Sequence, residues 1–171
     1  MHDIKNLVEI KLRKLVGQPV TCAAQAAAML TLQFGVLRQY KTPLGRTGES
    51  GDWSLHIQCP WRVVNLNGIY TGSTDYWQKS EDDESDVPGE TWNPELGNLR
   101  AKRMSSWVEN GRKSPPKVKS VQSDYLAGFR LNFDDEFALE VFPDSSVDED
   151  WRLLDRVDGE HFVIVAGRLE T

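Results

Sequence analysis

The stretch Trp53-Ser54-Leu55-His56-Ile57-Gln58-Cys59-Pro60-Trp61 decides the fold class. Its odd positions carry apolar side chains and its even positions up to Gln58 carry polar ones. This period of two predicts a β-strand with one buried face. Pro60 has no backbone N–H, so it marks a bulge or the end of the strand. The dipeptide Asn67-Gly68 follows between two short runs of strand-forming residues and predicts a β-hairpin.

The last third of the chain alternates in the same way and predicts an antiparallel meander. Two apolar triplets flank the loop 134–136: Phe129, Leu131 and Phe133, then Phe137, Leu139 and Val141. A two-residue loop would pair position 129 with Glu140. A three-residue loop pairs 133 with 137, 131 with 139 and 129 with 141, so that all six apolar side chains share a face. The sequence therefore favours the three-residue loop.

Three further patterns lie near the C-terminus. Asp158-Gly159 predicts a type I′ turn joining strands at 151–157 and 160–167. The run 162–166 is apolar at every position, so this strand should be central or covered on both faces. Ser146 and Glu149 have the spacing of a capping box and predict a single helical turn before Trp151.

The remaining segments predict one or two helices. Residues 3–16 fit a helix with Asp3 as N-cap, although a strand is an alternative there, and 97–110 fit a second helix. A strand is expected at 28–34, with 20–27 left open between helix and strand. Segment 35–52 indicates a loop, and the acidic segment 78–95 indicates a mobile surface loop. The expected fold is α+β, mainly antiparallel sheet with hairpins and a C-terminal meander.

Composition sets the class of protein. The 171 residues suit a single domain spanning 1–171, and 39% hydrophobic content is typical of a globular chain. No apolar run reaches the length of a membrane span, and the N-terminus lacks the pattern of a secretory signal. The two cysteines, Cys22 and Cys59, are then expected as reduced thiols in the cytoplasm.

Several segments resemble a small uncharacterised bacterial protein family. They are 53–62, then 72–75, and later 137–144 leading to Trp151-Arg152. The resemblance covers the chain from Gly17 to Gly167 and implies a bacterial source and one module. It implies no activity, catalytic residue or ligand.

Candidate chemistry is sparse. In a strand, His56 and Cys59 point to opposite faces, which separates the thiol from the imidazole, so a buried structural thiol is favoured over a nucleophile. Three scattered histidines do not provide a zinc site, and no cofactor motif occurs. Five residues are candidates to line a small-molecule pocket: Trp53, His56, Trp61, Asp75 and Trp77. Core packing is the alternative for Trp53 and Trp61.

Charge provides the remaining functional evidence. Segment 134–160 holds eleven acids against two arginines, which suits a basic protein partner, as for an immunity-type inhibitor. Asp135, Asp148 and Asp158 are the candidate partner-binding residues, and solvated loops are the alternative explanation. Nucleic-acid binding through the basic stretch 100–119 is disfavoured by a net charge of −6. The sequence therefore favours a non-enzymatic binding or interaction protein over a small-molecule binder or enzyme.

Overall fold

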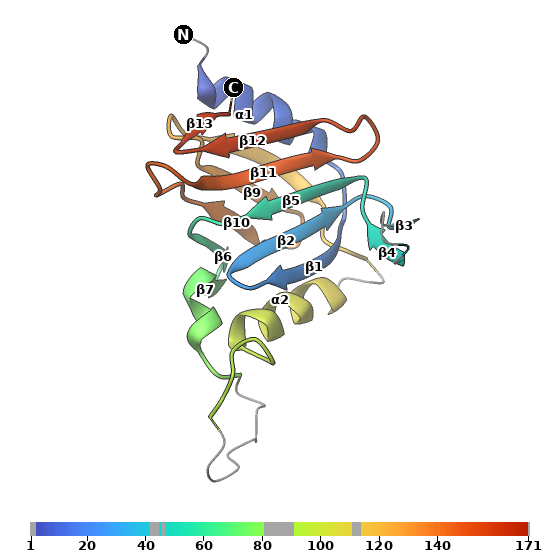
Figure 1. The fold of residues 1–171 in the computed structure, drawn as a ribbon, viewed down its shortest axis with the longest axis vertical. Helices are drawn as coiled ribbons and strands as arrows, with labels where there is room; N and C mark the ends of the chain where they lie inside the picture. The colour runs from blue at the N-terminus through green and yellow to red at the C-terminus, as the bar shows by residue number, and fades with distance from the viewer. Residues whose placement is uncertain (1–2, 42–44, 46, 81–90, 111–113, 171) are drawn as a thin grey trace.

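The structure is a computed structural model that describes residues 3–41, 45, 47–80, 91–110 and 114–170. In these residues it contains two α-helices, α1 (Ile4–Leu12) and α2 (Leu99–Asn110), and two 3₁₀ turns, η1 (Arg13–Leu15) and η2 (Ser73–Trp77) (Figure 1). The thirteen strands are β1 (Val20–Ala26), β2 (Met29–Phe34), β3 (Arg38–Lys41), β4 (Thr47–Ser50), β5 (Trp53–Ile57), β6 (Trp61–Asn65), β7 (Gly68–Gly72), β8 (Val118–Ser123), β9 (Phe129–Phe133), β10 (Ala138–Val141), β11 (Glu149–Asp155), β12 (His161–Val165) and β13 (Arg168–Leu169). The predicted α+β class is confirmed.

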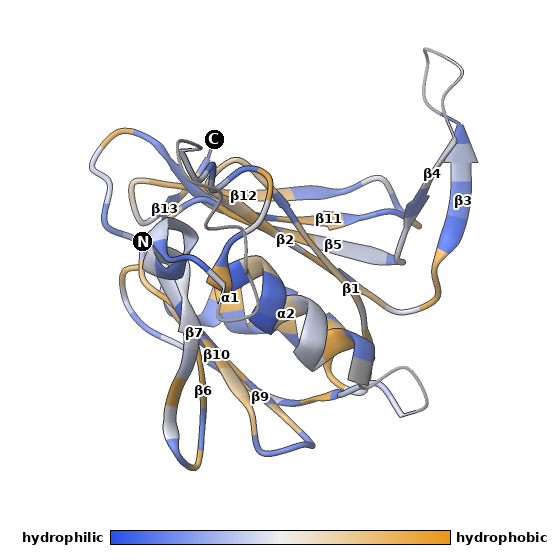
Figure 2. Ribbon diagram, turned by 90° about the horizontal axis from the view of Figure 1, so that it is seen from below, coloured by the Kyte–Doolittle hydropathy of each residue, from blue (hydrophilic) through white to orange (hydrophobic). Residues whose placement is uncertain are grey.

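Two antiparallel sheets face each other. The larger has the strand order β1-β2-β5-β11-β12-β13, and the smaller has the order β7-β6-β10-β9-β8. Seen from below, the two sheets form separate layers, while β3 and β4 form a two-stranded ribbon that projects from the larger sheet (Figure 2). The inner faces of both sheets supply one buried apolar cluster. The molecule is therefore a sandwich with a projecting ribbon.

Trp151 joins the two sheets at their centre. Its side chain on β11 is fully buried, with ring centroids 4.9 Å from Phe129 of the opposite sheet and 5.8 Å from Phe162. The indole N–H donates to the carbonyl oxygen of Ala127 at 2.9 Å. A buried tryptophan with a satisfied N–H contributes both apolar area and a fixed orientation.

The two helices close the open edges of the sandwich. Helix α1 begins after Asp3, whose carboxylate accepts a hydrogen bond from the Lys5 amide as the sequence predicted. It buries Val8 and Leu12 and contacts β8. Helix α2 contacts the edge strands β1 and β7 at the other edge. No helix among the described residues has the length and apolar content that crossing a membrane requires.

The register predicted for the meander is confirmed. Leu131 pairs with Leu139 and Phe129 with Val141, while the Phe133 amide donates to the Phe137 carbonyl at 2.9 Å. The hairpin predicted around Asn67-Gly68 is present between β6 and β7, but its two loop residues are Leu66 and Asn67, since Asn65 pairs with Gly68. The segment 20–27, for which the sequence allows helix or strand, contains the edge strand β1. Strand β12 lies inside the larger sheet, yet Val163 and Val165 on its outer side stay partly exposed.

Three local predictions are wrong. Segment 35–52 is not a plain loop, since it contains the ribbon of β3 and β4. The turn after β11 is not type I′. The Asp155 amide donates to the Glu160 carbonyl, so the loop has four residues, and among these four only Gly159 has a positive φ, whereas a type I′ turn needs two such residues. No helical turn forms at 146–149, because the Ser145 hydroxyl accepts from the amides of Val147 and Asp148 and holds a bend instead. The predicted loop 78–95 lies partly outside the described residues, at 81–90.

Candidate functional site

A pocket lies between the β3–β4 ribbon and the loop that joins β11 to β12. We call it the ribbon pocket. Its volume is about 490 Å³, and eight residues line it: Arg38, Gln39, Tyr40, Ser50, Gly51, Asp52, Arg156 and Val157. Both segments come from the same end of the larger sheet, because β5 and β11 are neighbouring strands. The pocket thus combines residues more than a hundred positions apart in the sequence.

Asp52 fixes the ribbon to the sheet. Its carboxylate accepts hydrogen bonds from the Val36 amide and from Arg38 Nε, both at 3.0 Å. These bonds lower the pKa of Asp52, the bond from Val36 most strongly, against the opposing effect of burial. The Asp52 carbonyl also accepts from the Arg156 amide at 2.9 Å, so one residue holds both walls of the pocket.

Gly51 allows the ribbon to leave the sheet at this point. A Cβ atom on Gly51 would lie 2.4 Å from the carbonyl oxygen of Phe34, which is fixed backbone. We expect Gly51→Ala to lower the free energy of unfolding by about 1–3 kcal/mol, because β2 and β4 must separate to admit the methyl group. Gly97→Ala is the matched control, since its Cβ would meet no atom within 4 Å. Urea melts that destabilise both variants equally would contradict this account.

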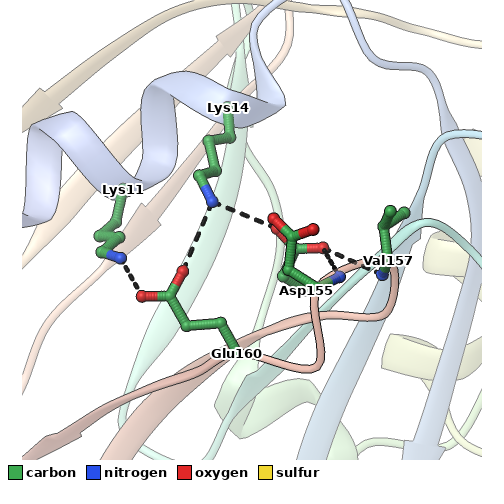
Figure 3. A network of polar contacts seen from close by, with 6 residues as sticks. Lys11, Lys14, Asp155, Val157 and Glu160 are labelled. Carbon is green, nitrogen blue, oxygen red and sulfur yellow. Dashed lines mark hydrogen bonds and ion pairs between the residues drawn. The ribbon is translucent and has the colours of Figure 1, made fainter.

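A network of ion pairs holds the other wall (Figure 3). Lys14 Nζ lies 3.2 Å from Asp155 Oδ2 and 3.5 Å from Glu160 Oε2, and Lys11 pairs with Glu160. Asp155 also accepts a hydrogen bond from the Val157 amide at 3.0 Å. Burial raises the pKa of Asp155, but its bonds to backbone amides and Lys14 outweigh that effect and lower the pKa. The network therefore joins the end of α1 to the loop that carries Arg156.

Tyr40 and Arg156 are the two pocket residues best placed for contact with a ligand. Arg156 is exposed, and its guanidinium carbon lies 5.7 Å from the centroid of the Tyr40 ring. Tyr40 keeps 42% of its surface exposed. Arg38 is paired with Asp52, whereas no carboxylate in the described part of the chain forms an ion pair with Arg156. The pocket therefore presents one uncompensated guanidinium beside an aromatic ring.

A polar network on the outer face of the larger sheet connects His56 to the pocket residues Ser50 and Gly51. Its Nε2 is 2.8 Å from Ser54 Oγ, which accepts from Gln33 Nε2 at 2.9 Å. Gln33 Oε1 in turn accepts from the Gly51 amide and the Ser50 hydroxyl. The serine and histidine have the spacing of a nucleophile and its base. Ser54 is fully buried, however, so a substrate cannot reach its hydroxyl.

Burial and the nearby Arg152 lower the pKa of His56 below its ordinary value of 6.5. The unfolded chain therefore binds a proton in a pH range where the folded chain does not. We expect the free energy of unfolding to fall as the pH drops below 6.5. The variant His56→Gln should flatten this dependence between about pH 5 and 6.5, above the range where carboxylates titrate. Urea melts across this range make the comparison, and an unchanged slope in the variant would contradict it.

The structure does not bring the five predicted ligand-binding residues into one pocket. His56 lies on the outer face of β5, whereas Trp53 is partly buried on the opposite face. Trp61 is buried at the start of β6. Asp75 and Trp77 belong to η2, where Asp75 accepts from the Thr71 hydroxyl at 2.9 Å and Trp77 is 67% exposed. None of the five lines the ribbon pocket, and His56 is linked to its residues Ser50 and Gly51 only through Ser54 and Gln33.

The three predicted partner-binding acids also lie apart. Asp135 accepts from the Trp107 indole at 2.8 Å in the β9–β10 loop of the smaller sheet. Asp148 and Asp158 flank opposite ends of β11, whose seven residues span roughly 20 Å. Four other acids of the segment 134–160 are paired with cations: Glu140, Glu149, Asp155 and Glu160. The acidic segment is therefore divided over both sheets.

Two further predictions concern reactive and basic residues. Cys22 and Cys59 are not joined by a disulfide bond. Burial, with a contribution from Asp150, raises the pKa of Cys59 to about 12, so its thiolate is not available as a nucleophile. The basic stretch 100–119 is not uniformly on the surface, because Arg100 is 1% exposed.

Neither Tyr40 nor Arg156 was predicted from the sequence. Arg38, Gln39, Tyr40 and Lys41 are all exposed, so the ribbon shows no alternation between buried and exposed positions that a sequence pattern could detect. No protein-family model, curated protein or solved structure matches this chain. The function of the chain must therefore be inferred from the geometry of the ribbon pocket.

Proposed function

We propose that this protein is a non-enzymatic binding protein, and that its ribbon pocket takes a small organic anion with a flat ring. The pocket volume of about 490 Å³ falls within the range of small-molecule sites. Two anchored segments form its walls, so the ligand meets groups that are already in place.

The observation that carries this proposal is the exposed Arg156 guanidinium beside Tyr40. Among the described residues no carboxylate pairs with this guanidinium, which can offer two parallel N–H groups to the carboxylate or phosphate of a ligand. The Tyr40 ring supplies an apolar face for stacking. The exposed Val157 extends the apolar surface on the other wall. An anionic group attached to a planar ring would contact both kinds of surface.

Binding without catalysis fits the state of the groups that could react. Ser54 is fully buried, and burial keeps Cys59 protonated. The lowered pKa of His56 leaves its imidazole neutral at pH 7, and its Nε2 contacts the Ser54 hydroxyl. Ser54 and His56 instead belong to the polar network that bonds to the pocket residues Ser50 and Gly51.

Benzoate is the probe that tests the proposal, with benzyl alcohol as its neutral counterpart. We expect benzoate to shift the amide resonances of 38–40 and 156–157 in NMR titrations, and benzyl alcohol to bind much more weakly. Arg156→Gln should weaken benzoate binding at least about tenfold, since a hydrogen bond to a charged group contributes about 1.5–3 kcal/mol.

Arg168→Gln is the matched control, because Arg168 is an exposed arginine on β13 outside the pocket. Its benzoate affinity should equal that of the wild type. Equal affinities for Arg156→Gln and the wild type would refute the proposal, as would shifts confined to other parts of the sheet.

A further inference from the structure

Arg100 is a buried arginine in the first turn of α2, far in the fold from the ribbon pocket. Its side chain is 1% exposed. Nε and Nη2 donate to Gln25 Oε1, Nη2 also donates to the Ala27 carbonyl, and Nη1 donates to the Ala28 carbonyl, at 2.9–3.2 Å. All these acceptors are uncharged. A guanidinium carries five N–H groups, so one hydrogen on Nη1 has no acceptor in the described part of the chain.

The positive charge of Arg100 has no counter-ion among the described residues. The guanidinium carbon lies 4.7 Å from the centroid of the Tyr76 ring, and Tyr76 and the more distant Asp75 both favour the charged form. The Asp75 carboxylate is itself bonded to Thr71 and Gly72. Buried charges in proteins are normally paired, because removing an ion from water is costly. Burial accordingly lowers the pKa of Arg100.

The helix itself adds to the positive potential. Asn98 caps α2 by accepting the Ala101 amide at 2.8 Å, which places Arg100 at the N-terminal end of the helix. The helix dipole favours anions at this end and opposes cations. The buried charge of Arg100 is therefore unfavourable both because it has left water and because it lies at the positive end of the helix dipole. A bound anion would offset both effects.

A small cavity adjoins Arg100 between α2 and the larger sheet. Its volume is about 200 Å³, and eight residues line it: Ala23, Ala24, Gln25, Leu30, Arg100, Ala101, Met104 and Ser105. The walls are mostly apolar, and Ser105 contributes a hydroxyl. Because the Gln25 side-chain oxygen faces Arg100, its amide nitrogen remains as a donor beside the cavity.

We propose that this cavity binds a short aliphatic carboxylate as the counter-ion of Arg100. The carboxylate accepts hydrogen bonds from Gln25 Nε2, the Ser105 hydroxyl and the unbonded Nη1 hydrogen of Arg100, while its carbon chain packs against Leu30 and Met104. A volume of about 200 Å³ holds roughly six heavy atoms at the 30 Å³ that one water molecule occupies. Butyrate has this size.

Butyrate and its neutral isostere butyramide test the proposal by NMR titration and thermal unfolding of the full chain. We expect butyrate to raise the melting temperature of the wild type and to shift the amides of 23–25 and 100–105. Butyramide should do neither. Absence of butyrate binding to the wild type, or equal binding of butyramide, would overturn the proposal.

The test variant fills the cavity and leaves Arg100 intact, because a variant of Arg100 itself could fail to fold. Ala101→Leu should weaken butyrate binding at least tenfold. Ser106→Leu, on the same helix but outside the cavity lining, should stay within twofold of the wild type. If Ala101→Leu binds butyrate as tightly as the wild type does, butyrate does not bind in this cavity and the proposal is wrong. Arg156→Gln should keep full butyrate affinity, so this test and the benzoate test fail independently.

Discussion

Trp151→Ala is expected to lower the free energy of unfolding by about 3–5 kcal/mol. The side chain is fully buried between the sheets, it contacts Phe129 and Phe162, and its N–H bonds to Ala127. Loss of the indole ring leaves a cavity where β9 and β11 face each other. It also leaves the carbonyl group of Ala127 without its hydrogen-bond donor. Urea or guanidinium melts with a two-state fit measure the change.

Trp77→Ala is the control for this prediction. Trp77 is 67% exposed and touches Tyr76 edge-on, with ring centroids 4.9 Å apart. Its replacement should cost less than about 1 kcal/mol, since exposed positions contribute little to stability. Similar losses for the two variants would mean that Trp151 does not join the sheets.

Leu139→Ala is expected to cost about 2–5 kcal/mol, the range for a buried leucine. Leu139 is fully buried opposite Leu131, on the inner face of the smaller sheet. Asn132, one position along β9, lies on the outer face and bonds to Ser120 at 3.0 Å. Asn132→Ala should cost no more than about 1 kcal/mol. The reverse order of the two losses would show that the register of β9 and β10 is shifted by one residue.

The register of this hairpin shows how much of the fold was predictable from sequence. In a strand with one buried face, apolar and polar residues alternate along the sequence. The register between two such strands must then place their apolar side chains on the same face. That rule located β5, β9 and β10 and selected the loop 134–136. It could not show that β5 pairs with β11, because partners distant in sequence leave no local pattern.

The candidate site was much less predictable. Arg38 and Tyr40 belong to a ribbon without a buried face, so no periodicity marks it as strand. The eleven acids of 134–160 form a dense run in the sequence, but the fold divides them between the β9–β10 hairpin of the smaller sheet and the ends of β11 in the larger one. Arg100 belongs to a run of basic residues, and only the tertiary packing of α2 on the β1–β2 hairpin shows that it is buried.

The central position of the β5–β11 ladder has a consequence for how the chain folds. Ile57 pairs with Trp151, 94 residues later, so the middle of the larger sheet forms only after most of the chain is available. Closing so long a loop costs entropy before any contact compensates for it, and non-local strand pairing slows folding. During synthesis, β1, β2 and β5 emerge from the ribosome with the edge of β5 unpaired, which exposes it to misassociation with other chains. Refolding should therefore be slow and sensitive to protein concentration, and a chaperone that shields this edge would raise the yield.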